Sequence, residues 1–256
     1  MDRILFGQGE AIFAALPERV LANLRAPASE NALVWNLLYP LAAPTLSLGR
    51  LMAIRPLAGS VSSPAADEAL EPYFWGFAIS GQRLPQLDEA LEAVDGPGQQ
   101  TEVDVILAGQ KHLVLIEAKN LGGLGQCARY ASGRCPEVHG PSPAIEQGCR
   151  YWGGGEAAFN AQLDFGERPS AESDPPPCFR HYQLARTFTL GTALGARLGL
   201  EPHLWLLVPR SRWRRLRPAW DDFAERVRQE ARWRTLRVLA WEDVRALGSE
   251  RRLPKR

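Results

Sequence analysis

The segment from Thr101 to Lys119, TEVDVILAGQKHLVLIEAK, constrains the fold of this 256-residue chain more than any other part of its sequence. It contains two runs rich in β-branched and aliphatic residues, joined by Ala-Gly-Gln-Lys, and this pattern predicts a β-hairpin. Each run carries apolar residues on both of its faces, as central strands of a sheet do. We therefore expect this hairpin to lie in the middle of the sheet of an α/β protein.

The charged residues of the hairpin gather on one face. Because side chains alternate across a strand, Glu102 and Asp104 share a face, and so do Glu117 and Lys119. A tight turn pairs Glu102 with Glu117, whereas a loop two residues longer pairs Asp104 with Glu117. Either register brings together three carboxylates and one ammonium group, and buried charges of this kind require a compensating cation or substrate.

A divalent metal ion is the natural compensator of these charges. The carboxylates of Asp104 and Glu117 and the carbonyl of Ala118 offer the oxygen ligands that Mg²⁺, or Mn²⁺ in its place, prefers. Lys119, one of only three lysines in the chain, would then stand beside an attacking water or a scissile phosphate. The alternative is that Glu117 and Lys119 are ordinary polar residues on the solvent side of a hairpin.

Asp104 followed by the run Glu117-Ala118-Lys119 resembles the hallmark of the PD-(D/E)XK, or restriction-endonuclease-like, nuclease superfamily. That hallmark is an acidic residue on one strand of a hairpin and (D/E)-x-K on the next. The proline that usually precedes the first acid is absent, because the residues before Asp104 are Glu-Val. The resemblance implies the family core, which has the order αβββαβ and a central mixed sheet flanked by helices; the elements expected from Ser29 to Pro209 fit this order. The resemblance implies a metal-dependent nuclease that hydrolyses phosphodiester bonds, most simply those of DNA, through water activated by Mg²⁺.

Two further catalytic candidates enter through the same resemblance. Many members place a glutamate on the first core helix, where it reaches the metal, and Glu30 stands in the matching place. Glu30 can equally be a first-turn acid that favours the helix dipole. Several branches use a glutamine or tyrosine of the second core helix, and Gln183 in RHYQLAR resembles it. A competing QxxxY match, Gln126 to Tyr130, follows Lys119 too closely to lie on that helix.

The rest of the chain predicts the elements around the hairpin, all within a single domain of residues 1–256. A helix capped by Ser29 is expected to end at Pro40 and Pro44, with strands over GRLMAIRPL and YFWGFAIS. A short helix or an ordered loop is expected over LPQLDEALEAV. Later helices are expected over RHYQLARTFTLGTALGARLG and AWDDFAERVRQEARW, and later strands over HLWLLVP and TLRVLAW. Residues 120–178, rich in Gly and Pro, form an insertion that needs something to hold it together.

All the cysteines lie in or beside this insertion: Cys127, Cys135, Cys149 and Cys178. In a reducing compartment this distribution favours a metal site over disulfides, and four thiolates satisfy a zinc ion or an iron–sulfur cluster. A metal there would act as a staple rather than as a catalyst. The alternative is that the cysteines are small buried hydrophobic residues.

A basic loop is expected directly after the last core strand. Arginine pairs with phosphates and stacks with tryptophan on bases, so this loop could bind nucleic acid. A solvated, arginine-rich surface is the alternative. The candidate contacts are Arg210, Arg212, Trp213, Arg214 and Arg215.

The sequence also bears on the location of the protein, its oligomeric state and the class of its function. No run approaches the roughly 20 apolar residues of a membrane span, and the first residues show no leader pattern, so we expect a cytoplasmic location and no membrane partner. A homodimer is allowed, since many enzymes that cut both strands use two active sites. A different class stays open: a non-catalytic nucleic-acid-binding or scaffold module of the same fold, stapled by a four-cysteine metal site.

Overall fold

A computed structural model describes residues 5–26, 29–42, 46–61, 67–98, 100–140, 148–171 and 175–250 of the chain. Its strands are β1 (Leu46–Ser47), β2 (Ala58–Gly59), β3 (Ala69–Phe74), β4 (Phe77–Ala78), β5 (Val105–Ala108), β6 (His112–Ala118), β7 (Glu201–Val208) and β8 (Leu236–Ala240). Its α-helices are α1 (Ile12–Ala15), α2 (Glu18–Arg25), α3 (Glu30–Ala42), α4 (Leu48–Met52), α5 (Leu87–Asp95), α6 (Ala128–Ala131), α7 (Pro177–Arg180), α8 (Tyr182–Leu198), α9 (Arg210–Glu225), α10 (Glu230–Trp233) and α11 (Trp241–Glu250). Two short 3-10 helices, η1 (Arg150–Trp152) and η2 (Phe159–Ala161), lie in the insertion.

The chain is an α/β protein with a strongly curled, mixed eight-stranded sheet flanked by helices. The strand order is β1-β3-β5-β6-β7-β8-β2, and β4 pairs with β3 beside this path. Pairing is antiparallel from β1 to β6, parallel from β6 through β7 to β8, and antiparallel again between β8 and β2. The predicted hairpin, β5 and β6, therefore lies in the middle of the sheet.

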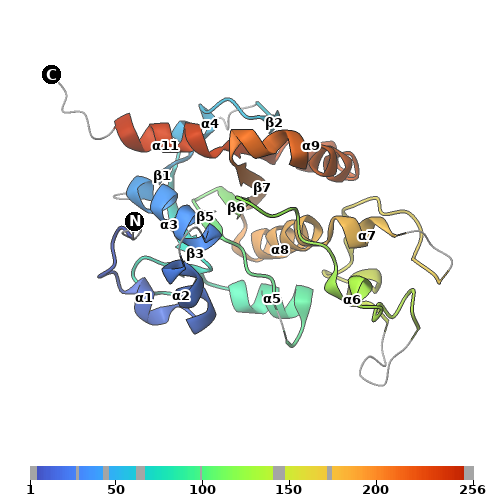
Figure 1. Ribbon diagram of the computed structural model, residues 1–256. Coiled ribbons are helices and arrows are strands. Elements are labelled where there is room, and N and C mark those ends of the chain that lie inside the picture. Colours follow the sequence, from blue (N-terminus) through green and yellow to red (C-terminus); the bar gives the residue numbers. More distant parts are fainter. Residues whose placement is uncertain are drawn as a thin grey trace.

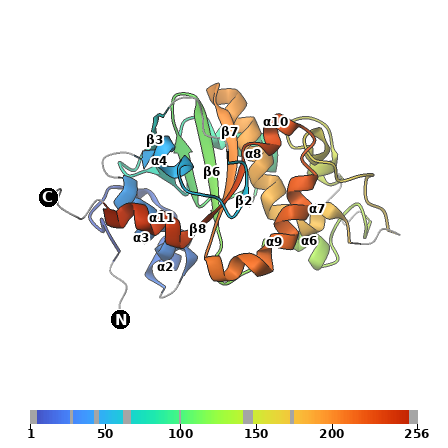
Figure 2. The same ribbon diagram turned by 90° about the horizontal axis from the view of Figure 1, so that it is seen from above.

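Helices cover both faces of this sheet (Figures 1 and 2). On one face α3 and α11 pack over it, and Trp35, Val114 and Val244 belong to the same buried cluster. On the other face α5 and α8 pack over β5 and β6, and α9 joins α8 over β7. Burial on both faces explains why β6 has apolar residues at nearly every position. The exceptions are His112 at its start and Glu117, which is only 1% exposed.

Local sequence patterns predicted most of these elements. The hairpin, α8, β7 and β8 are confirmed, and LPQLDEALEAV forms the helix α5 rather than an ordered loop. The cap of α3 is also confirmed, because the Ser29 hydroxyl accepts a hydrogen bond of 3.1 Å from the amide of Ala32. The helix ends at Ala42, two residues beyond Pro40; Pro44, the second proline expected to close it, lies outside the described residues.

Four predicted elements were wrong in type or extent. The supposed strand YFWGFAIS is broken by a turn at Trp75 and Gly76 into the end of β3 and β4, and the single helix expected over AWDDFAERVRQEARW is divided between α9 and α10. The supposed strand GRLMAIRPL contains the helix α4, because a short apolar run does not distinguish a helix from a strand. The supposed basic loop is the first half of α9. Leu216, Trp220 and Phe223 recur there at helical spacing and bury one side of an otherwise charged helix.

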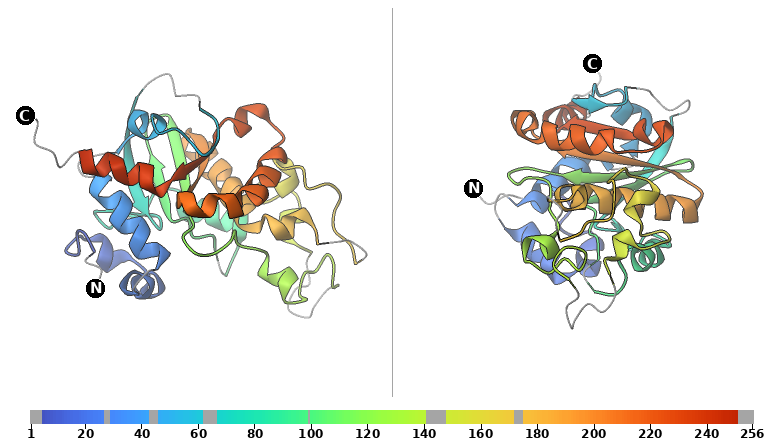
Figure 3. Two further views of the ribbon diagram at one scale, coloured as in Figure 1. Left: turned by 45° about the horizontal axis from the view of Figure 1, so that its top comes forward. Right: turned by 90° about the vertical axis from the view of Figure 1, so that its right-hand side faces the viewer.

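Aromatic and aliphatic side chains pack the insertion between β6 and α8 against the rest of the protein. This segment, drawn green to yellow, lies at the end of the molecule remote from both termini (Figures 1 and 3). Phe159, Leu163 and Phe165 are buried in a cluster shared with α8 and α9. Leu163 also forms a β-bridge with Val227. None of the described helices has the length and apolar character required to cross a lipid bilayer.

Candidate active site

The register of the hairpin places Asp104 opposite Glu117. Val105 pairs with Ile116 and Ala108 with Leu113, so the next pair along is Asp104 with Glu117. This is the longer-loop register of the two that the sequence allowed. The amide of Ala118 donates a hydrogen bond of 2.8 Å to Oδ2 of Asp104, and the other oxygen of Asp104 has no hydrogen-bond partner among the described residues.

Helix α8 holds Glu117 in place from the other side. Nε2 of Gln183 donates to Oε2 of Glu117 at 2.7 Å, and the hydroxyl of Thr187 donates to Oε1 at 2.6 Å. The amide oxygen of Gln183 accepts a hydrogen bond of 2.8 Å from the amide of Gly125. These bonds fix the orientation of the Gln183 amide. In the competing QxxxY match, Tyr130 lies in the short helix α6 and Gln126 lies just before that helix.

Helix α3 and the end of β6 supply the remaining polar groups. Oε1 of Glu30 accepts a hydrogen bond of 2.6 Å from the amide of Asn120, and Oε2 lies 3.7 Å from Nζ of Lys119. Lys119 itself is fixed at the edge of β7, because its amide donates to the carbonyl of Leu207 at 2.9 Å. The structure thus brings together Asp104, Glu117, Lys119, Glu30 and Gln183 from four separate parts of the chain.

The electrostatics of this group favour a bound cation. Desolvation raises the pKa of Asp104 to about 8, with the neighbouring Glu117 carboxylate adding to the effect, while the Ala118 amide and Lys119 oppose it. Desolvation also raises the pKa of Glu117, against the opposing influence of Lys119 and of the hydrogen bonds from α8. Three carboxylates therefore face one ammonium group, and a divalent cation is the charge that would balance them.

One expectation about this region was wrong, and one residue was overlooked. Glu102 does not belong to the group, because it forms an ion pair with Arg19 of α2; Glu30 is the third carboxylate instead. Thr187 was missed, although its position four residues after Gln183 places both side chains on one face of a helix.

The predicted four-cysteine metal site is not formed. Cys127, Cys135, Cys149 and Cys178 are free and do not cluster at the spacing of metal ligands: among the described residues no three of their sulfur atoms lie within 4.8 Å of one another. They line one small cavity with aromatic residues. Burial raises the pKa of Cys149 to about 11 and that of Cys178 to about 12, so both are neutral thiols. Trp152 donates a hydrogen bond of 3.3 Å to the sulfur of Cys178.

The predicted nucleic-acid contacts lie on α9, which begins directly after the end of β7 and so starts at the same edge of the sheet as Lys119. Arg210 forms an ion pair with Asp243 of α11 at 2.5 Å. Trp213 packs against the core cluster beneath the helix, so it is not a free stacking surface. Arg214 and Arg215 are exposed, Arg212 is half-buried, and these three have no ion-pair partner among the described residues.

No family model, no curated protein and no solved structure matches this chain.

Proposed function

We propose that this protein is a metal-dependent nuclease of the PD-(D/E)XK type, which hydrolyses phosphodiester bonds in DNA. The observation that carries the proposal is the pairing of Asp104 with Glu117 across the central hairpin, with Lys119 beside them. The order α3, β3, β5, β6, α8, β7 supports it, because it follows the αβββαβ core of that superfamily.

The residues present suit a magnesium ion. Asp104 has an oxygen without a hydrogen-bond partner among the described residues, both carboxylates are desolvated, and Glu117 is oriented by two donors from α8. Asp104, Glu117 and the carbonyl of Ala118 would hold the ion, with Glu30 at its edge. A bound Mg²⁺, or Mn²⁺, supplies an activated water and a positive charge at the scissile phosphate.

The chain's own groups would do the remaining work. The ammonium group of Lys119 stabilises negative charge that develops on the phosphate oxygens in the transition state. Glu30 keeps Lys119 in place through their ion pair. Gln183 and Thr187 hold Glu117 in one orientation, which keeps the ligand geometry fixed during the reaction.

The first turns of α9 are the surface proposed to bind the DNA backbone. This part of the helix begins at the same edge of the sheet as Lys119. Its positive charge, on Arg212, Arg214 and Arg215, is not neutralised by any described carboxylate. Guanidinium groups bind phosphates well, and contacts of this kind position the nucleic acid without reading its sequence.

The test is cleavage of linear, circular and single-stranded DNA by the purified protein with Mg²⁺ or Mn²⁺. We expect cleavage by the wild type and its loss in Asp104→Asn and Lys119→Ala. Lys111→Ala is the matched control, because Lys111 is an exposed lysine in the turn of the same hairpin. Cleavage that persists in both site variants contradicts the proposal. Tight DNA binding without any cleavage would favour the alternative, a non-catalytic binding module.

A further inference from the structure

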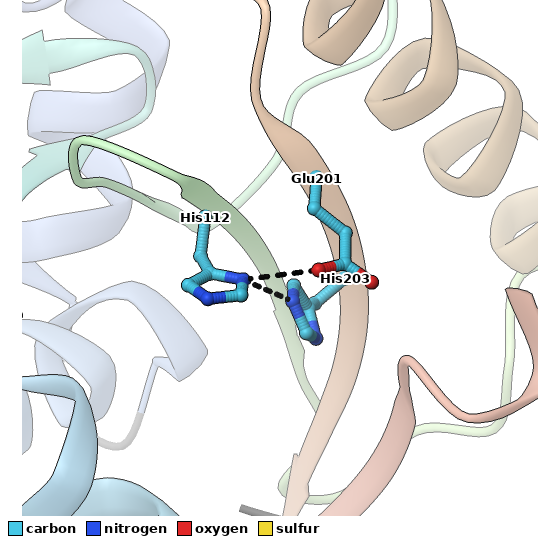
Figure 4. Close-up of side chains that lie close together, drawn as sticks. All are labelled: His112, Glu201 and His203. Carbon is cyan, nitrogen blue, oxygen red and sulfur yellow. Dashed lines mark hydrogen bonds and ion pairs between the residues drawn. The ribbon is translucent and has the colours of Figure 1, made fainter. Parts of the chain in front are cut away.

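Three side chains that the sequence analysis overlooked meet at the end of β6 and β7 opposite to the candidate active site (Figure 4). His112 is the first residue of β6; Glu201 and His203 are on the parallel strand β7, in register with His112 and Val114. Alternate residues of a strand share a face, so all three side chains project from one face of the sheet. Glu117 lies on the opposite face and on the order of 16 Å further along β6.

The three ligand atoms have the spacing of a metal site. Nδ1 of His112 lies 3.0 Å from Nε2 of His203 and 3.4 Å from Oε2 of Glu201. All three atoms lie within 4.8 Å of one another. Ligand atoms held ~2.0–2.1 Å from a tetrahedral zinc ion stand about 3.4 Å apart. The two separations from Nδ1 of His112 are thus close to the edge of such a tetrahedron, and three protein ligands would leave its fourth corner for a water molecule.

The protonation of this group suits metal binding. Without a metal, a single proton on Nδ1 of His112 can serve both acceptors, Nε2 of His203 and the Glu201 carboxylate. Burial, together with His112 and the guanidinium groups of Arg232 and Arg237, lowers the pKa of His203 to about 3. A neutral imidazole is the form that binds metals, and a metal ion would take the place of the shared proton. Glu201 supplies the negative charge that offsets the nearby guanidinium groups.

We propose that His112, Glu201 and His203 form a zinc site, distinct from the magnesium centre, that clamps the first residues of β6 to those of β7. Two imidazoles and one carboxylate favour zinc over Mg²⁺, which prefers oxygen ligands. The side chain of Glu201 is 54% exposed, so an ion reaches the site from solvent. This site does not depend on the proposed nuclease activity.

The test measures zinc retained by the full chain. Protein stripped of metal is loaded with Zn²⁺, passed through gel filtration in Mg²⁺ buffer, and analysed for zinc per chain and for its melting temperature. We expect one zinc per chain and a higher melting temperature, because zinc binds the folded state. His112→Gln and Glu201→Gln should weaken zinc binding at least about tenfold and remove the rise in melting temperature.

Two control variants separate this site from the other candidate metal positions. Asp104→Asn and Cys149→Ser should keep the zinc, since they alter the active site and the cysteine cavity. Loss of zinc in either control, with retention in Glu201→Gln, overturns the proposal and assigns the ion elsewhere. Absence of zinc from the wild type overturns it as well. Because Glu201 is exposed, Glu201→Gln keeps the test decisive even if His112→Gln fails to fold.

Discussion

The side-chain amide of Gln183 donates a hydrogen bond of 2.7 Å to Glu117, a residue 66 positions earlier in the chain. The same amide accepts from the backbone of Gly125, near the start of the insertion. One side chain of α8 therefore couples the candidate metal ligand on β6 to the loop that follows it. The orientation of Glu117 depends on a residue that is not itself placed to bind the metal.

Gln183→Met should impair metal binding without unfolding the protein. Methionine has a similar length but cannot donate a hydrogen bond to Glu117, so the carboxylate loses one of its two orienting bonds. Losing such a supporting bond typically costs about 10–100-fold in metal affinity or activity. The measurement is the Mg²⁺ concentration needed for half-maximal DNA cleavage. Thr192→Val is the control, since it removes a hydroxyl on the same helix that bonds to Gln162 instead; equal losses in both variants would contradict the prediction.

Asp104→Asn should stabilise the metal-free protein at pH 8. The pKa of Asp104 is raised to about 8, so the folded state holds a proton that the unfolded state releases near its ordinary value. The wild type therefore loses stability as pH rises from about 4 to 8, by up to ~1.4 kcal/mol per pH unit, and asparagine avoids this loss. Melting temperatures of both proteins in chelator at pH 5 and pH 8 test this. The prediction is refuted if the difference in melting temperature between Asp104→Asn and the wild type is no larger at pH 8 than at pH 5.

Metal binding should release a proton and strengthen as pH rises towards 8. A cation can bind Asp104 only after the carboxyl loses its proton, because the metal and the proton compete for the same oxygens. Isothermal titration with Mn²⁺ in two buffers of different ionisation enthalpy counts the protons released. Binding heats that do not depend on the buffer at pH 7 would show that Asp104 is already ionised.

The sequence predicted the centre of the fold and the members of the candidate site better than their surroundings. Alternating residues around Asp104 and Glu117 carried enough information to place both on one face of adjacent strands. Which register formed, and that Glu102 pairs with Arg19 instead, depended on the loop and on α2, which no local pattern describes.

Three other features were beyond local patterns for a physical reason. The first half of α9 was mistaken for a loop because its arginines mask a narrow apolar stripe. The cysteines were expected to bind a metal because the insertion lacks periodicity, yet aromatic residues that come from scattered positions pack it. His112, Glu201 and His203 become neighbours only through the parallel pairing of two strands separated by the whole insertion. The spacing Glu-x-His at the start of β7 was the sequence feature that could have indicated a metal site, because it places both side chains on one face of the strand.

Replacing Arg212, Arg214 and Arg215 together by glutamine should weaken DNA binding and reduce its dependence on salt. If each guanidinium group binds one phosphate, the slope of log affinity against log salt should fall by about 0.9 for each arginine replaced. Fluorescence anisotropy at several salt concentrations measures this. Arg217→Gln is the control, because Arg217 is paired with Asp221 on the same helix; an unchanged slope in the triple variant would exclude α9 as the binding surface.

Asp95→Asn should destabilise the whole protein, because Asp95 ties four segments together. Its carboxylate pairs with Arg186 of α8 at 3.0 Å, accepts from Tyr151 of the insertion at 2.8 Å, and accepts from the amide of Thr101 ahead of β5 at 2.5 Å. Burial alone would raise the pKa of Asp95, but Arg186 and Thr101 outweigh it and hold that pKa below its usual value.

The expected loss is about 3 kcal/mol, since removing one partner leaves the Arg186 guanidinium buried without its counter-charge. Because the folded-state pKa of Asp95 is depressed, its contribution is complete above the ordinary pKa of an aspartate and is lost only as pH falls below it. Urea unfolding at pH 7 and pH 3 measures both effects. Asp88→Asn is the matched control: its ion pair with Arg83 is solvent-exposed, so it should cost less than about 1 kcal/mol. Equal effects of the two substitutions at pH 7 would show that Asp95 does not anchor the insertion to the sheet.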